Sequence, residues 1–340
     1  MRILIDSYNT SFQNRSGGVQ NRINNYMKAL FDNNIEAKLY NKWTDKISDY
    51  DILHVFKLGL DHFEITRYSK QLNIPVIVSS ILPDQDRLRI LVNSFLRMFH
   101  LCTSPLYSII KEELELSDCV MTETRKERAF IIRNYGIKGN KIVSLPNGVD
   151  TSHINTSPSL FADKYGIKSK YLLQVGLVEP NKNQFNVIRA INDLDIDFVI
   201  IGGPSRLNPY YFDKCRRIAR KNVHFIGWID NNDELLWSAY CGSQATILPS
   251  RKEIFGNSIV EAGCCGSNLI KSKELELTEY GLDRYFIDID PEDINDIRKK
   301  IEYAMKKDKS PSQQADFIRV FGWGNVMKRY IEVYKRILER

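Results

Sequence analysis

The sequence lacks most of the features that mark membrane-spanning, secreted and zinc-binding proteins. Its 340 residues include no apolar run that reaches the roughly 18 residues of a membrane span, and no apolar signal core follows Met1. The six cysteines form no Cys-x-x-Cys pair and no other zinc-ligand spacing, and several lie in apolar runs. We therefore expect a cytoplasmic protein whose cysteines are reduced and structural.

A strong excess of one charge is also absent. Lys and Arg total 48 and Asp and Glu total 42, which leaves a formal net charge of +6, and the basic residues are scattered along the chain. The sequence therefore indicates no broad basic face for nucleic acid, and small acidic ligands fit better. With 43% hydrophobic and 26% charged residues, a chain of this length can form two soluble domains, each with its own core.

Short apolar runs alternate with longer amphipathic stretches along the whole chain. This alternation is typical of β-α-β units, in which helices cover both faces of a parallel sheet. The pattern runs twice, so it predicts an α/β fold with two Rossmann-like, doubly wound lobes. The predicted strands are 3–6, 37–40, 52–56, 76–79, 119–122 and 142–145 in the first series, and 171–176, 198–202, 223–227, 245–249 and 269–272 in the second.

The segment 147–158 separates the two series. It is rich in Gly, Pro, Asn and Ser, which is the composition of a turn and linker. We place the hinge there, with a first lobe at 1–150 and a second lobe from residue 151. Open parallel sheets bind ligands at the carboxyl ends of their strands, so we expect two facing lobes to form a central cleft lined by strand-to-helix loops.

The strongest chemical signal is the segment 249–266, Pro-Ser-Arg-Lys-Glu-Ile-Phe-Gly-Asn-Ser-Ile-Val-Glu-Ala-Gly-Cys-Cys-Gly, which follows a strand and opens a helix. Gly256 allows close approach of the backbone, and either Asn257 or Ser258 can act as the N-cap. The free amides and the positive end of the helix dipole then suit a phosphate group.

Two carboxylates belong to the same segment. Glu253 is expected on the loop before the helix and Glu261 in the first helical turns. Carboxylates at these places suit the hydroxyl groups of a hexose and a ribose, because an ionised carboxylate accepts hydrogen bonds at both oxygens. The residue types alone are equally compatible with a capped surface helix that carries two solvated glutamates.

Two other loops contain residues suited to phosphate. Gly17 and Gly18 precede a predicted helix, so their backbone can approach a donor phosphate or an acceptor, although a plain turn would look the same. Lys182 is expected in the strand-to-helix turn after Gly176, where an ammonium can neutralise a diphosphate. An isolated lysine at such a place also fits a solvated helix start.

As a set, these blocks resemble the family 4 retaining glycosyltransferases (glycosyl transferases group 1), which have the GT-B fold. Glu253 and Glu261, separated by seven residues, look like the signature of that family. The segment 134–150 resembles its interdomain crossing, and 175–183 resembles the diphosphate-binding segment of its second lobe. The segment 321–334 is similar to its tail, which implies a second lobe at 151–322 and a helix at 323–340 that crosses back to the first lobe.

The resemblance implies that a hexose moves, with retention, from a nucleotide diphosphate sugar, with a UDP-sugar as the first guess. The acceptor would be a glycan or lipid-linked glycan in polysaccharide, O-antigen or cell-surface glycoconjugate synthesis. The nucleotide sugar is a substrate, so no cofactor is expected. No metal is expected either, since no Asp-x-Asp lies in a suitable loop and fixed positive groups can replace a cation.

Each site residue receives a role from the same resemblance. Glu253 and Lys182 are the expected catalytic residues, with Glu253 on the donor sugar and Lys182 on the diphosphate, while Glu261 holds the ribose. The other expected donor-binding residues present backbone to the sugar and phosphates: Gly17, Gly18, Gly176, Ile254, Phe255, Gly256, Asn257 and Ser258.

Two departures from the family pattern concern positive charge and histidine. Leu177 stands where the family commonly has an arginine, so Lys182 acts alone or together with Arg251 or Lys252. The stretch 78–83 contains no counterpart of the histidine that many members place near the reacting sugar. His54 ends the preceding strand, and we favour a buried and satisfied histidine there over one that faces the cleft. We assign no catalytic base.

The acceptor side is expected on the first lobe. The segment 87–101 combines three arginines with Leu, Ile, Val, Phe and Met over a length too short to span a bilayer. Such a stretch can lie on the inner face of a membrane and bring the site to a lipid-linked acceptor. The alternative is a core helix with its basic residues on the wet face.

Other functions fit the same architecture. A two-lobed nucleotide-sugar epimerase or a sugar-phosphate synthase would also present glycines and glutamates to a nucleotide sugar. A non-catalytic binding protein of the same fold is a third alternative, and the departures at Leu177 and at 78–83 favour it, whereas Glu253, Glu261 and Lys182 argue against it.

Overall fold

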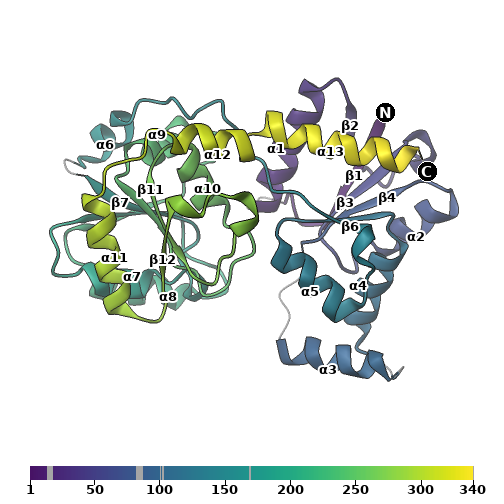
Figure 1. Cartoon of the computed structure of the whole chain (residues 1–340), viewed down its shortest axis with the longest axis horizontal. Coiled ribbons are helices and arrows are strands. Elements are labelled where there is room, and N and C mark those ends of the chain that lie inside the picture. Colours follow the sequence, from purple (N-terminus) through teal and green to yellow (C-terminus); the bar gives the residue numbers. More distant parts are fainter. Residues whose placement is uncertain (14–17, 82–86, 100, 102, 168–169, 340) are drawn as a thin grey trace. The chain divides into compact units, whose positions relative to one another are not determined.

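The computed structural model describes residues 1–13, 18–81, 87–99, 101, 103–167 and 170–339. These residues form two α/β units, each built on a six-stranded parallel sheet (Figure 1). Lobe 1 combines Met1–Gly148 with Trp323–Arg340, and lobe 2 is Val149–Gly322. The predicted fold class, two doubly wound parallel sheets, is therefore confirmed.

The sheet of lobe 1 contains every strand predicted for the first series, each within one residue of its predicted ends. The central strands β3, β4 and β5 are fully buried apolar runs, which is typical of a parallel sheet covered on both faces, whereas the edge strand β2 is partly exposed. Their order across the sheet is β2-β1-β3-β4-β5-β6. The bounds are β1 Arg2–Ser7, β2 Glu36–Leu39, β3 Ile52–Phe56, β4 Val76–Ser79, β5 Cys119–Thr122 and β6 Ile142–Ser144.

Helices cover both faces of the first sheet. One face packs against α1 (Gly18–Asp32) and α13 (Trp323–Leu338). The other packs against α2 (Phe63–Gln71), α4 (Pro105–Leu116) and α5 (Arg125–Tyr135). Alternate strand residues point to opposite faces, so each strand contributes to both cores. The final helix α13 thus belongs to lobe 1, with its aromatic residues in the core of that lobe.

The sheet of lobe 2 contains all five strands predicted for the second series and one that was not predicted. The missed strand, β12, is a four-residue edge strand whose exposed Asp288 interrupts the apolar run, and among the described residues it pairs only with β11. The order is β12-β11-β10-β7-β8-β9. The bounds are β7 Tyr171–Val175, β8 Asp197–Ile201, β9 Val223–Gly227, β10 Ala245–Leu248, β11 Asn268–Ser272 and β12 Phe286–Ile289.

The second sheet is likewise covered on both faces. One face packs against α6, α9, α10 and α12, and the other against α7, α8 and α11. The helix bounds are α6 Ser159–Tyr165, α7 Gln184–Ile191, α8 Pro209–Ile218, α9 Glu234–Gly242, α10 Asn257–Cys264, α11 Ile294–Lys306 and α12 Gln313–Phe321. Lobe 1 also has α3 Arg87–Met98, and the short 3-10 turns are η1 Ile47–Asp49, η2 Gly139–Lys141, η3 Pro180–Lys182, η4 Thr278–Tyr280 and η5 Asp283–Tyr285.

The chain enters and leaves lobe 2 at adjacent points. The amide of Val149 donates a 2.7 Å hydrogen bond to the carbonyl of Phe321, and Val149 forms a parallel bridge with Gly322. The first boundary, at Gly148/Val149, falls within the segment where the sequence predicts the hinge. Both boundaries of lobe 2 are thus tied together by backbone hydrogen bonds.

The composition led to expectations about the cysteines and about membrane-spanning segments. In the described part of the chain the cysteines are free thiols, four of them buried, as the sequence predicts; Cys102 lies outside that part. None of the helices in the described ranges combines the length and the hydropathy that crossing a membrane would need.

Candidate active site

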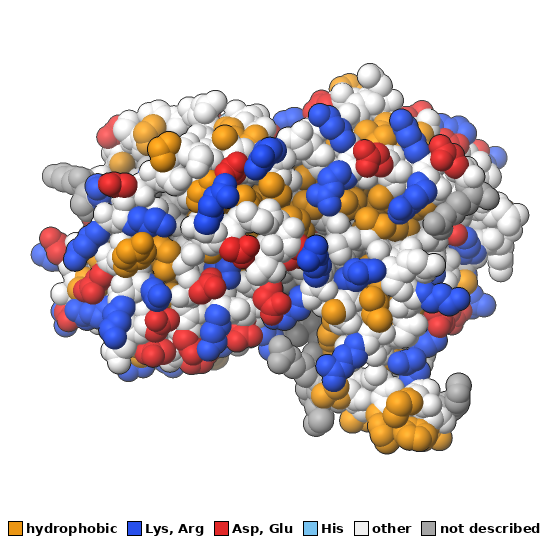
Figure 2. Space-filling model, viewed as in Figure 1, with side chains coloured by type: hydrophobic (Ala, Val, Ile, Leu, Met, Phe, Trp, Pro, Cys, Tyr) orange, Lys and Arg blue, Asp and Glu red, His pale blue; other side chains and the backbone are white. Residues whose placement is uncertain are grey.

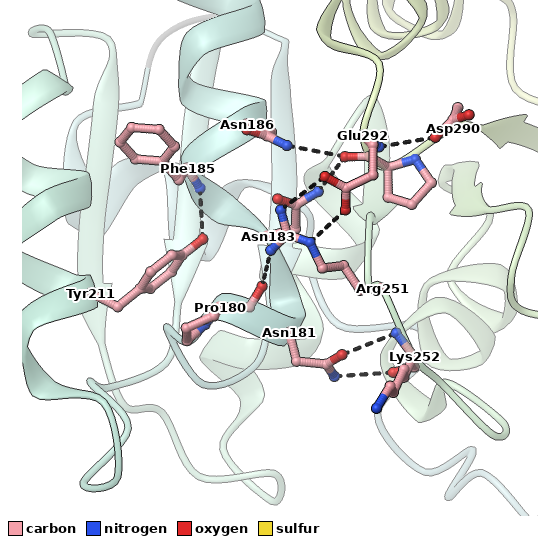
Figure 3. A network of polar contacts seen from close by, with 11 residues as sticks. Pro180, Asn181, Asn183, Phe185, Asn186, Tyr211, Arg251, Lys252, Asp290 and Glu292 are labelled. Atoms are coloured by element: carbon pink, nitrogen blue, oxygen red, sulfur yellow. Dashed lines mark hydrogen bonds and ion pairs between the residues drawn. The ribbon is translucent and has the colours of Figure 1, made fainter. Parts of the chain in front are cut away.

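Two strand-to-helix loops of lobe 2 are joined at the carboxyl edge of the sheet. They follow β7 and β10, which are neighbouring strands. The amide of Arg251 donates to the carbonyl of Asn181 at 2.9 Å, and the Asn181 side chain bonds both the amide and the carbonyl of Lys252 at 3.0 Å. Figure 3 shows how Asn181 reaches across to Lys252. These bonds hold residues 180–183 and 249–253 together.

The joined loops bring two predicted site residues into contact. The Nζ atom of Lys182 lies 2.5 Å from Oε2 of Glu253, and the two side chains are 21% and 19% exposed. The carbonyl of Lys182 accepts a 2.7 Å bond from the buried Gln174 side chain. The next residue, Asn183, has a left-handed backbone (φ 57°) and starts α7. Lys182 is therefore held at the end of a short turn, with its ammonium directed at Glu253.

Arg251 has a structural partner. Its guanidinium donates to both carboxylate oxygens of Glu292, at 2.5 and 3.3 Å, and to the carbonyl of Pro180 at 2.5 Å (Figure 3). Of the two residues proposed to compensate for Leu177, Arg251 is thus engaged in joining the loops. The Lys252 side chain is exposed beside them.

The start of α10 differs from the sequence prediction. Asn257 or Ser258 was expected to cap the helix, and this expectation is wrong: the cap position is Gly256, with a left-handed backbone (φ 72°, ψ 63°). A Cβ at Gly256 would lie 2.6 Å from Cδ2 of Leu248 and 2.9 Å from Cδ2 of Leu275. Only glycine combines this backbone with such close packing.

The remaining residues around the helix start divide into buried and exposed groups. The Phe255 ring is buried and makes edge contacts with the rings of Tyr280 and Phe321. It anchors the loop in the core of lobe 2, so only its backbone is available to a ligand. Ile254 is exposed, and Ser258 is partly exposed in the first turn of α10. First-turn amides of a helix have no intrahelical acceptor and point outward.

Glu261 has a partner that the sequence did not indicate. It lies on α10, where its Oε2 atom accepts a 2.8 Å hydrogen bond from the hydroxyl of Tyr240 on α9. Burial raises the pKa of the Glu261 carboxyl, and the bond from Tyr240 counteracts part of that rise. Tyr240 lies in an apolar segment whose pattern is typical of a core helix. The residues around it in the sequence therefore do not indicate that it binds Glu261.

Glycines end three neighbouring strands at the same edge of lobe 2. Gly176 follows β7, Gly202 follows β8 and Gly227 closes β9. The Gly202 amide donates to the Gly227 carbonyl at 2.7 Å, and a Cβ on Gly202 would lie only 2.0 Å from the carbonyl oxygen of Gly176. The predicted Gly176 thus belongs to a continuous stretch of bare backbone, of which Gly202 and Gly227 were not singled out.

The structure describes only some of the site residues that were predicted in lobe 1. Gly17 lies outside the described residues, and Gly18 is the exposed first residue of α1. In the stretch without the family histidine, Ser80 donates a 2.9 Å bond to Oε1 of Glu127. Burial raises the pKa of Glu127 to about 8. No sequence pattern distinguished Glu127 from the other glutamates.

His54 is a buried core residue, as predicted. Its Nδ1 atom lies 3.0 Å from the hydroxyl of Tyr26 and 2.9 Å from that of Tyr334, and its Nε2 atom lies 2.9 Å from Oγ of Ser79. Burial lowers the pKa of His54 well below its ordinary value, so the ring is neutral. His54 therefore links α1, β4 and α13 and does not serve as a base.

Two doubly wound parallel lobes in one chain define the GT-B class. The family model of glycosyl transferases group 1 matches residues 161–319, and that of Glycosyltransferase Family 4 matches residues 8–153. Together the two models match most of the chain, one in each lobe. The chain belongs to the family 4 glycosyltransferases of group 1.

Curated relatives and solved structures agree with this assignment. O-antigen chain mannosyltransferase B of Escherichia coli is 23% identical over 241 residues, which cover 66% of this chain and 62% of that protein. Serotype-specific mannosyltransferase WbdA of Escherichia coli is 22% identical over 253 residues, 67% of this chain and 30% of that protein. The matched part of this chain thus spans less than two thirds of either relative. The structure of Anabaena HepE in complex with UDP shares the fold, with a TM-score of 0.75 at 13% identity over 99% of this chain and 100% of that one.

Proposed function

We propose that this chain is a retaining glycosyltransferase, which moves a hexose from a nucleotide diphosphate sugar to a glycan or lipid-linked glycan. The observation that carries the proposal is the 2.5 Å ion pair between Lys182 and Glu253, at the glycine-lined edge of lobe 2 and beside the start of α10. The Escherichia coli relatives are named as mannosyltransferases of O-antigen and serotype, which supports a hexose donor and a surface-glycan product. HepE was solved with UDP, which supports a UDP-sugar as the first donor to test.

In this proposal Lys182 exchanges one anion for another. A diphosphate competes with Glu253 for the ammonium, because charge-assisted hydrogen bonds to phosphate are strong and add to the attraction of the α10 dipole. Glu253 is then released to accept hydrogen bonds from the hydroxyl groups of the sugar. As the bond between the sugar C1 and the phosphate oxygen breaks, the fixed charge of Lys182 stabilises the leaving diphosphate.

The proposed transfer requires no nucleophile from the protein. The acceptor hydroxyl oxygen forms its bond to C1 on the face from which the diphosphate leaves, and the leaving phosphate takes the acceptor proton. Glu261 holds the ribose, and the backbone at Gly176, Gly18 and 254–258 approaches the sugar and phosphates. We include metal independence in the proposal, because Lys182 supplies a fixed positive charge; transfer that stops on addition of EDTA and returns with Mg²⁺ would contradict this part.

The first test is thermal unfolding with UDP, GDP, ADP and their sugar derivatives. A nucleotide that binds only the folded state raises the unfolding midpoint, by an amount that follows its concentration relative to Kd. We expect a clear shift with one nucleotide and a loss of affinity of about tenfold or more in Lys182→Met and Glu261→Ala, since each removes a charged hydrogen-bonding group. Lys70→Met is the control, because Lys70 forms an ion pair with Asp118 in lobe 1 at 2.7 Å and should leave the shift intact.

The outcomes separate the parts of the proposal. A shift with GDP or ADP would replace UDP and keep the donor site, whereas no shift with any nucleotide would overturn the donor assignment. Retention is tested by NMR of the product of the identified donor with a glycan acceptor. An anomeric configuration opposite to that of the donor would contradict the retaining mechanism.

We also propose that the enzyme works in the cytoplasm, at the inner face of the membrane, and meets the membrane through residues 87–101. A lipid-linked acceptor would place the reacting group at that surface.

A further inference from the structure

The helix α3 of lobe 1 exposes an apolar face. Leu91, Val92, Phe95, Met98 and Phe99 are 48–61% exposed, and the rings of Phe95 and Phe99 pack together with centroids 4.8 Å apart. Their spacing places them along one side of the helix. Figure 2 shows hydrophobic side chains gathered over the part of lobe 1 that Figure 1 labels α3. An apolar patch of this kind on a folded protein marks an interaction site.

The opposite face of α3 turns polar side chains toward the lobe. Asn93 is buried, and its Oδ1 atom accepts a 2.6 Å bond from the amide of Ser104. Arg97 hydrogen-bonds the buried Tyr107, and its guanidinium lies against Gly136, where a Cβ would be 2.5 Å from Nη1. The alternative of a core helix with its basic residues on the wet face therefore does not fit Arg97. The inward side of α3 thus combines these polar groups with the buried Ile90, while its described outward side is apolar.

The helix α3 and its neighbour α5 carry mainly positive charge. α3 packs against α5, and the two helices contain one acidic residue between them, Glu127, which is buried. Arg133 near the end of α5 and Lys138 beyond it are exposed, within three positions of Gly136 in the sequence, and Glu115 of α4 lines the same hollow as Lys138. The cations of the two helices are Arg87, Arg89, Arg97, Arg125, Lys126, Arg128 and Arg133. An apolar helix face whose own helix and neighbouring helix carry cations and no exposed acid complements a surface that is both apolar and anionic.

We propose that α3 and the adjoining end of α5 dock lobe 1 on the anionic surface of a lipid bilayer. The apolar side chains of α3 enter the boundary between headgroups and acyl chains, and Arg133 and Lys138 contact anionic headgroups. The 12 residues of α3 extend about 18 Å, less than the bilayer core of about 30 Å, so the helix lies in the plane of the interface. This inference rests on the proposed function, because it specifies a lipid-linked acceptor.

A second copy of the chain is a poorer occupant of the same face. In a two-fold interface each patch meets itself, so the cations of α5 would face the same cations of the partner. Like charges at short range oppose such a contact, whereas an anionic bilayer neutralises them. The charge of the patch thus favours the bilayer over self-association.

Vesicle flotation with the full chain tests the proposal. The vesicles contain phosphatidylcholine alone or with about one third phosphatidylglycerol, a composition that isolates the electrostatic contribution. We expect binding to the anionic vesicles that weakens with salt, and a loss of about tenfold or more in the double variant Phe95→Ser/Phe99→Ser. Phe31→Ser on α1 is the matched control, since Phe31 is 81% exposed on another element of lobe 1 and should leave binding unchanged.

A second pair of substitutions tests the cations. Arg133→Glu/Lys138→Glu should lower binding to the anionic vesicles by about tenfold and reduce its salt dependence, because each reversal replaces attraction by repulsion. Circular dichroism and the nucleotide-induced rise in unfolding temperature establish that each variant is folded, so a loss of flotation then reports the surface alone.

Three results would overturn the docking surface. They are no flotation of the unmodified chain, equal flotation of the Phe95→Ser/Phe99→Ser variant, and a dimer in light scattering that this variant converts to a monomer. Flotation without any nucleotide-induced stabilisation would keep the docking surface and overturn the donor site. Stabilisation without flotation would do the reverse, so the two proposals fail separately.

Discussion

The carboxyl group of Glu261 depends on a single neighbouring side chain, the hydroxyl of Tyr240. Burial raises the pKa of Glu261, and the hydrogen bond from Tyr240 opposes this rise by stabilising the carboxylate. A carboxylate that accepts this bond is held in one position on α10. Under the proposal that Glu261 holds the ribose, Tyr240 is a positioning residue, because it acts on the nucleotide through Glu261.

Substitution of Tyr240 by Phe should weaken nucleotide binding by about tenfold, because a buried bond to a charged group is lost. It should also move the acidic limb of the pH profile of nucleotide affinity to higher pH, since the pKa of Glu261 rises further without the hydroxyl. Affinity measured by calorimetry from acidic to neutral pH checks both effects. Tyr171→Phe is the control: it removes a hydroxyl that donates to the carbonyl of Ala239 at 2.8 Å. The same pH limb in both variants would contradict the positioning role.

The contact between Lys182 and Glu253 could not be predicted from the two residues taken separately. The sequence predicted a phosphate-binding lysine and a sugar-binding glutamate, and the structure adds that they neutralise each other at 2.5 Å. The sequence also left open whether Arg251 supports Lys182. Its bonds to Glu292 and Pro180 give it a structural role instead.

At the level of the element, the start of α10 depends on one glycine. Gly256→Ala should lower the free energy of unfolding by about 1–3 kcal/mol, because it combines left-handed backbone strain with a clash against Leu248 and Leu275. Urea unfolding measures the change. Gly266→Ala is the matched control, since Gly266 has nearly the same φ, 76°, but a Cβ there meets no atom within 4 Å.

The difference between the two variants isolates the packing cost. If Gly256→Ala and Gly266→Ala lost the same stability, the close contacts with Leu248 and Leu275 would be irrelevant. In that case the glycine would serve only the turn. We expect Gly256→Ala to lose more free energy of unfolding than Gly266→Ala. We also expect it to bind the nucleotide more weakly, because a shift at the start of α10 would displace the loop 253–258.

The stability of the whole molecule should depend on pH through two buried carboxyls of lobe 1. Burial raises the pKa of Glu127 to about 8 and that of Glu113 to about 7, from an ordinary value of 4.5. As pH rises through this window the unfolded chain loses these protons first, so it binds fewer protons than the folded chain. The free energy of unfolding therefore falls between about pH 4.5 and 8.

Glu127→Gln should remove a large part of this dependence, because an amide fills the site without titrating. Urea unfolding at several pH values between 5 and 8.5 should give a smaller loss of stability toward high pH in the variant than in the unmodified chain. Glu112→Gln, at an exposed glutamate of α4, should leave the slope unchanged. His54 acts in the opposite direction below its ordinary pKa of 6.5, but it is present in all three proteins and cancels in the comparison. Equal slopes would refute the role of Glu127.

Features that depend on neighbouring residues in the sequence were predicted correctly, whereas features that depend on contacts between distant residues were not. The strands of both sheets were predicted within one residue, apart from β12, because a buried parallel strand is a short apolar run whatever surrounds it. β12 was missed because an edge strand of four residues containing Asp288 has no such run. The cap of α10 was predicted wrongly because Gly256 is selected by the side chains of Leu248 and Leu275, the second of which lies 19 positions further along the chain.

By itself the sequence determined the class of fold, the two series of strands and the family, because apolar periodicity and short motifs are properties of neighbouring residues. Only the tertiary structure decided which side chains meet: Lys182 with Glu253, 71 positions apart, and Tyr240 with Glu261, 21 positions apart. It also decided that α3 turns Arg97 inward and exposes Phe95 and Met98, because the orientation of an amphipathic helix is set by what it packs against. Contacts between distant segments follow from packing, which one-dimensional patterns do not contain.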